Sequence, residues 1–122
     1  MATTTKAVTA ILNGVTMTAA AGDVTTDGPD LDTGFGAQLG IKLTNGATGP
    51  TVAAQVQIQV SQDDSKFYNF GGALVGSVAN SAVSSWSIEI PIGVEHIQLV
   101  SGSNTGQNVT VDADISQVTV IA

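Results

Sequence analysis

The sequence predicts an all-β fold, namely a single antiparallel β-sandwich of about eight strands. The chain has 122 residues, of which 43% are hydrophobic, so it is long enough to bury the core of one domain. Short segments that alternate apolar and polar residues recur along it, and turn-forming Gly, Asn, Asp and Pro residues separate them. These observations leave two topologies open, a jelly-roll-like and an immunoglobulin-like sandwich.

The N-terminal region is predicted to contain an arm and a hairpin. Residues 1–6 are small and rich in Thr, so they are expected to form an extended arm in front of the sandwich domain, residues 7–122. One strand is predicted from Ala7 to Leu12 and a second from Val15 to Ala19. The two are expected to pair because Asn13-Gly14 between them is typical of a two-residue hairpin turn.

Residues 22–36 are predicted to form a long acidic loop, since they contain four Asp, four Gly and a Pro. This loop is either a solvated connection between the sheets or a functional segment. No metal site is predicted firmly. Asp27, Asp30 and Asp32 are the weak candidates for calcium ligands, because calcium takes oxygen ligands from flexible loops. Their spacing is not that of an EF-hand.

The later strands are predicted from alternation with a period of two residues. In the clearest example Val56, Ile58 and Val60 share one face and three Gln share the other. Trp86 lies on the same face as Ile88, so its side chain is expected in the core. Further strands are predicted at residues 38–44, 73–75, 96–99, 109–115 and 117–121.

Two of these runs, residues 56–60 and 117–121, are strongly β-prone and carry no charge and no Pro. Left as free sheet edges they would promote aggregation. We therefore expect each to be a central strand or to be covered by another chain.

Charge and composition exclude several classes of function. The formal net charge is −7 and the chain has only three Lys and no Arg, so no nucleic-acid partner is predicted. The absence of Cys excludes disulfide frameworks and thiol chemistry. No apolar run approaches the roughly 20 residues that span a bilayer, so no membrane partner is expected.

No catalytic residue is predicted, and the protein is expected to be neither an enzyme nor a cofactor carrier. The one His, His96, lies in a predicted strand beside Glu95, and no Gly-x-Ser-x-Gly turn presents a nucleophile. Asp112 and Asp114 share one strand face about 7 Å apart. Paired carboxylates serve glycoside hydrolysis, but the chain has few aromatic residues to hold a sugar, so this pair is interpreted as solvated.

Tyr68 and Phe70 carry an alternative function, that of a carbohydrate-binding β-sandwich module. If residues 67–70 form a strand, these two rings share a face. An exposed ring there would stack against a sugar or against a neighbouring subunit.

A particular order of features runs from about Val52 to Ile121. An alternating strand is followed by Gln62-Asp63-Asp64-Ser65-Lys66-Phe67-Tyr68, a Gly-rich stretch, and Trp86-Ser87-Ile88-Glu89-Ile90-Pro91-Ile92-Gly93-Val94-Glu95-His96-Ile97-Gln98-Leu99. A Gly/Asn turn and a closing alternating strand complete it. This order resembles the small β-sandwich structural proteins of tailed-phage virions.

The resemblance implies a non-enzymatic virion protein, in the first place a head decoration (cement) subunit bound at capsomer junctions, or else a small tail or neck component. It also implies assembly in the host cytoplasm, the major capsid protein or other virion subunits as partners, and a homo-oligomeric state. Contact residues are then expected in the arm and the acidic loop, namely Ala2, Thr3, Thr4, Thr5, Lys6, Asp30, Asp32 and Phe35.

Overall fold

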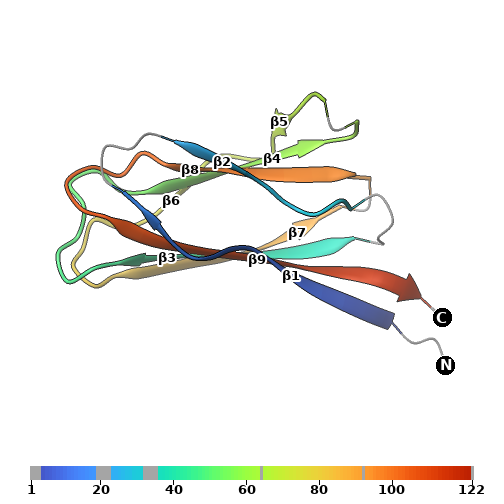
Figure 1. Cartoon of the computed structure of the whole chain (residues 1–122), viewed down its shortest axis with the longest axis horizontal. Coiled ribbons are helices and arrows are strands. Elements are labelled where there is room, and N and C mark those ends of the chain that lie inside the picture. Colours follow the sequence, from blue (N-terminus) through green and yellow to red (C-terminus); the bar gives the residue numbers. More distant parts are fainter. Residues whose placement is uncertain (1–3, 19–22, 32–35, 64, 92, 122) are drawn as a thin grey trace.

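The computed structural model describes residues 4–18, 23–31, 36–63, 65–91 and 93–121. It contains nine strands in two layers (Figure 1). They are β1 (Thr4–Met17), β2 (Val24–Asp27), β3 (Ala37–Asn45), β4 (Gln55–Ser61), β5 (Tyr68–Asn69), β6 (Leu74–Val75), β7 (Val83–Ile90), β8 (His96–Gly102) and β9 (Val109–Ile121). The described residues include no helix able to cross a membrane.

The strand order identifies the topology. One sheet has the order β1-β9-β3-β7 and the other β2-β8-β4-β5, and every pairing is antiparallel. The short strands β5 and β6 lie along the same edge of β4, so together they occupy one strand position. The first strand pairs with the last, the second with the second last, and the third with β7, which is the winding of a jelly roll. The predicted antiparallel sandwich is confirmed, and this topology selects the jelly-roll alternative over the immunoglobulin-like one.

The core lies between the two sheets and follows the predicted alternation. Leu39, Val56, Leu99, Val111 and Ile115 have no exposed surface. Burying these branched side chains from both sheets is the main driving force for the fold. The run at residues 56–60 belongs to β4, which lies inside its sheet, as expected for a central strand. The run at residues 117–121 ends β9, and only Gln117 also pairs with β3, so residues 118–121 pair with β1 alone among the described strands and are not central.

The predicted hairpin at Asn13-Gly14 is wrong. Val15 continues β1 and pairs with Val111 of β9, while Leu12 pairs with Ala113, so Asn13-Gly14 forms a bulge within one strand. Gly14 has a φ of 60°, and its N–H donates to Asp112 Oδ1 at 2.7 Å. A G1-type bulge and a type I′ hairpin turn both use a Gly with positive φ, so the dipeptide alone does not distinguish them.

Three other expectations also differ from the structure. Residues Thr4–Lys6 of the predicted arm belong to β1 and pair with the end of β9. The rest of the arm, residues 1–3, lies outside the described residues. The predicted loop contains β2, an edge strand whose exposed side chains give no alternation signal. Trp86 is half-buried rather than fully in the core, because β7 is the last strand of its sheet.

Candidate interaction surface

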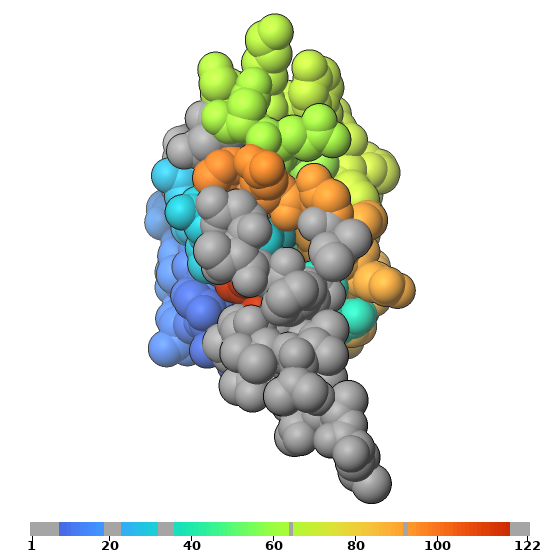
Figure 2. Space-filling view, turned by 90° about the vertical axis from the view of Figure 1, so that its right-hand side faces the viewer, coloured from blue at the N-terminus to red at the C-terminus, as the bar shows by residue number. Residues whose placement is uncertain are grey.

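The start of β1, the end of β9 and several turns lie at one end of the sandwich, which we call the terminal end (Figure 1). Its described residues also include 27–31, 61–63, 65–66, 91 and 93–95. Figure 2 views the molecule onto this end, with the β4–β5 region projecting at the top. Residues 4–6 of the predicted arm and residues 27–31 of the predicted acidic loop therefore lie at the same end, whereas Asp23, which bonds Ser103, lies at the opposite end.

Backbone hydrogen bonds fix three of these segments to one another. The N–H of Gly28 donates to the carbonyl of Ile97 at 2.8 Å, and that of Leu31 donates to Glu95 at 2.7 Å. The N–H of Glu95 donates in turn to Ser61 at 3.1 Å. Leu31 is buried and anchors its segment in the core. The described part of the acidic segment is thus held in one position rather than being a solvated connection.

The side chains of His96 and Asp30 contact each other on this surface. His96 Nδ1 lies 2.7 Å from Asp30 Oδ1, and the side chain of His96 is 17% exposed whereas that of Asp30 is 69% exposed. The contact ties residue 30 to the first residue of β8. Because Asp30 still presents most of its carboxylate to solvent, it remains accessible to a partner.

The described carboxylates make this end acidic. Asp27, Asp30, Asp63 and Glu95 are all exposed. The pKa of Asp63 is lowered because its carboxylate accepts hydrogen bonds from the N–H of Lys66 at 2.9 Å, the N–H of Ser65 at 3.0 Å and the hydroxyl of Ser61 at 3.0 Å. Such a surface favours a partner that carries positive charge.

The ends of β1 and β9 form a two-stranded ribbon that runs beyond the rest of its sheet (Figure 1). β3 begins at Ala37, which pairs with Gln117, so residues 118–121 of β9 pair only with β1 among the described strands. On the side of β9 where no described strand pairs with residues 118–121, the backbone N–H and C=O groups are available for pairing with an extended segment of another chain.

The candidate calcium ligands are not brought together as far as they are described. Asp27 lies opposite Gln98 in the β2–β8 pair, and Asp30 binds His96. Asp32 and Phe35 lie outside the described residues, as do Ala2 and Thr3. Among the residues with described positions, no group of three His, Cys, Asp or Glu could hold a metal ion.

The two candidate stacking rings have different environments. Tyr68 in β5 is 65% exposed, whereas Phe70 is partly buried and packs against the core. Of the two rings, Tyr68 is therefore the more available to stack on a ligand.

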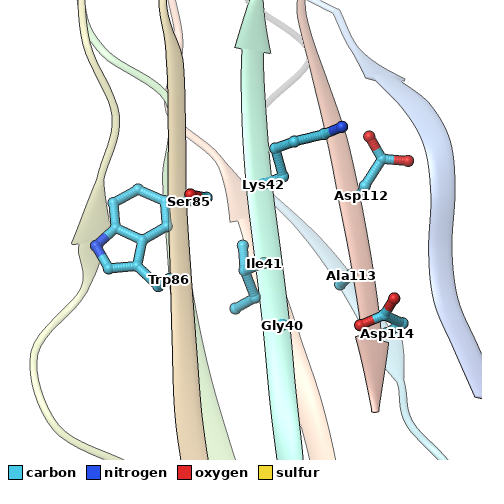
Figure 3. A pocket seen from close by; sticks show the side chains of 8 residues that line it. All are labelled: Gly40, Ile41, Lys42, Ser85, Trp86, Asp112, Ala113 and Asp114. Carbon is cyan, nitrogen blue, oxygen red and sulfur yellow. The ribbon is translucent and has the colours of Figure 1, made fainter. Parts of the chain in front are cut away.

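A shallow groove of about 400 Å³ crosses the outer face of the four-stranded sheet, and sequence reasoning missed it (Figure 3). Asp112 and Asp114 of β9 line it, as predicted for side chains on one face, and Lys42 of β3 extends toward Asp112. Gly40 forms its floor, since a Cβ there would lie 2.9 Å from Asp114 Oδ1. The sequence feature that could have predicted the groove is Gly40 itself. A Gly at an outward position inside an alternating strand often marks a site where another group lies close to the backbone.

Comparison with known proteins shows the fold. No protein-family model matches the sequence, and no curated protein gives a significant match. The K3 cleaved adhesin domain of Lys-gingipain from Porphyromonas gingivalis W83 superposes with a TM-score of 0.59 at 14% identity, covering 89% of this chain and 71% of that domain. A chain in the structure of infectious bursal disease virus, Gx strain, gives a TM-score of 0.50 at 11% identity over 94% of this chain, which spans 32% of that viral chain.

Proposed function

We propose that the protein is a non-enzymatic structural component of a virus particle, in the first place a decoration subunit that binds the major capsid protein of a phage head. The observation that carries the proposal is the jelly-roll topology, which recurs in viral capsid domains. Fold alone does not determine function. The similarity of fold to a chain of infectious bursal disease virus and the sequence resemblance to tailed-phage virion proteins support the same role.

The terminal end is the surface proposed to bind the particle. Its ribbon supplies backbone groups for strand pairing, and residues 27–31 supply fixed, exposed carboxylates. Each contact can be weak, because the symmetry of a particle repeats it many times.

Mass spectrometry of gradient-purified particles from the source, with a copy-number estimate, tests the role. We expect hundreds of copies per particle, in proportion to the capsid lattice. A few to a few dozen copies would overturn the head position in favour of the tail or neck. Absence from particles would overturn the virion role altogether.

A truncated variant tests the surface. Deletion of residues 2–6 is expected to abolish binding to particles that lack the protein, while the circular dichroism spectrum stays that of the parent. Ala47→Ser serves as the matched control, because Ala47 is exposed in the turn that follows β3 at the opposite end. Equal occupancy of the truncated and control proteins would contradict the assignment of the terminal end.

Carbohydrate binding is the second candidate, carried by the exposed ring of Tyr68. It predicts that the parent binds a component of a broad glycan array and that Tyr68→Ala lowers this affinity about fivefold or more, since ring stacking contributes about 1 kcal/mol or more. Failure of the parent to bind any glycan would discard this candidate.

A further inference from the structure

The two edges of the four-stranded sheet differ in regularity. β1 has three register shifts against β9, and bulges of this kind protect an edge from pairing with other chains. β7 pairs with β3 from Val83 to Ile90 without interruption. Its sequence contains no Lys, no Pro and one charge, Glu89. No described strand pairs with its other side, so β7 offers a straight edge of eight residues.

Apolar side chains next to this edge are incompletely covered. Trp86 and Ile88 point toward the core, yet both are only half-buried, whereas their partners on β3, Ile41 and Leu39, are 2% and 0% exposed. In Figure 3 the indole of Trp86 lies on the side of β7 that faces away from β3. A further strand beside β7 would cover this apolar surface and satisfy the outward backbone groups together.

We propose that the further strand is β7 of a second copy, paired antiparallel about a two-fold axis at Ser87. The two four-stranded sheets then form one continuous sheet across the dimer. The inference is independent of the proposed particle role, because it concerns the isolated protein in solution.

The register follows from the faces of the strand. In a continuous sheet, directly opposed residues lie on the same face. Because side chains alternate between the faces along β7, two opposed residues must both have even numbers or both have odd numbers. With Ser87 on the axis, Trp86 of one copy lies opposite Ile88 of the other, and Ser85 lies opposite Glu89. Seven residues pair, from Ser84 to Ile90, and Pro91 falls outside.

The neighbouring register of equal length is less favourable. With Trp86 on the axis, Ile88 faces Ser84 instead of Trp86, and Val83 faces the carboxylate of Glu89. Registers shifted further pair fewer residues, since Pro91 cannot donate a hydrogen bond. Apolar pairs across strands contribute favourably, so the axis at Ser87 is preferred.

Electrostatics also allow this pairing despite the net charge of −7 on each copy. In the Ser87 register the two Glu89 residues are offset by four residues, about 13 Å along the strands. This exceeds the screening length of about 8 Å at physiological salt, so their repulsion is largely screened.

The composition of the chain permits a direct test, because it has no Cys and one Trp. Directly opposed residues have Cα atoms about 4.5–5.5 Å apart, within disulfide range. Ser87→Cys is therefore expected to form a covalent dimer under mild oxidation. Ser85→Cys, on the same face of the same strand, is the matched control and is expected to stay monomeric because it faces Glu89.

Two further measurements complete the test. Sedimentation of the parent from micromolar to millimolar concentration is expected to show a monomer–dimer equilibrium, with the Trp86 emission shifting to the blue as the dimer forms. Ser87→Lys is expected to abolish the dimer with an unchanged circular dichroism spectrum, because two ammonium groups would oppose each other. A parent that stays monomeric, or a Ser85→Cys variant that cross-links as fast as Ser87→Cys, would overturn the proposal.

Discussion

The two ends of the sandwich are built in opposite ways. At the end opposite the termini, which we call the turn end (residues 45–54, 76–82 and 102–108), the polar side chains of Asn45 and Asn104 are buried and donate to backbone carbonyls. At the terminal end the carboxylates of Asp27, Asp30 and Glu95 are exposed. The turn end uses these buried amides to hold the fold, whereas the terminal end also leaves carboxylates exposed to a partner.

The largest effect is expected from Gly49→Ala at the turn end. A Cβ on Gly49 would lie 2.0 Å from the carbonyl oxygen of Val78 and 2.8 Å from the carbonyl carbon of Ala79, and neither backbone atom can move freely. We expect the free energy of unfolding to fall by about 3 kcal/mol or more, measured by urea denaturation. Gly46→Ala in the same turn is the control, since nothing lies within 4 Å of its Cβ position. Equal losses in the two variants would contradict the close packing of the turn end.

Asn104→Ala is expected to have the next largest effect. The amide of Asn104, which is 3% exposed, donates to the carbonyls of Met17 at 3.0 Å and Gln107 at 2.9 Å. Its removal leaves buried carbonyls without a donor, so we expect a loss of about 2 kcal/mol in urea denaturation. Asn80→Ala, which removes an exposed acceptor for the N–H of Gly49, should cost less than half as much. A larger loss of stability in Asn80→Ala than in Asn104→Ala would show that burial does not determine how much these hydrogen bonds stabilise the fold.

At the terminal end, breaking the contact between His96 and Asp30 is expected to cost less. Asp30 is largely solvated, so solvent screens the interaction. A double-mutant cycle with Asp30→Asn and His96→Gln should give a coupling energy below about 1 kcal/mol. A coupling above about 2 kcal/mol would mean that the terminal end, like the turn end, depends on its polar contacts for stability.

The same contrast explains how much of the molecule could be predicted from its sequence. Buried strands are predictable from sequence, because Val56 and Ile58 must face the core and Gln57 between them must face away from it. The edge strand β2 buries almost nothing, so no pattern marked Val24–Asp27 as a strand. The sequence around Gly14 predicts a turn instead of a bulge, because the acceptor that stabilises the bulge, Asp112, lies 98 residues away.

The candidate surface was predictable in part. The acidic character of residues 22–36 was visible, and Asp30 proved exposed. The contact between Asp30 and His96 was not predictable from the sequence. The two residues are 66 positions apart and come together only because β2, which precedes Asp30, pairs with β8, which begins at His96. Strand alternation over residues 67–70 predicts that Tyr68 and Phe70 share a face, and only the packing distinguishes the exposed Tyr68 ring from the partly buried Phe70 ring.

The smallest effect, and the one specific to pH, concerns Asp63 at the terminal end. Donation from the N–H groups of Lys66 and Ser65 and from the Ser61 hydroxyl favours the carboxylate, so the pKa of Asp63 in the folded state lies below its usual value near 4. A group with a lowered folded pKa adds stability that is fully present above the unfolded pKa and is lost as the pH falls through the folded one. We therefore expect the parent to lose more stability than Asp63→Asn when urea denaturation is compared at pH 5 and pH 3. An NMR titration of the Asp63 carboxyl that gives an ordinary pKa would contradict this, and would mean that the turn at residues 61–66 is open in solution.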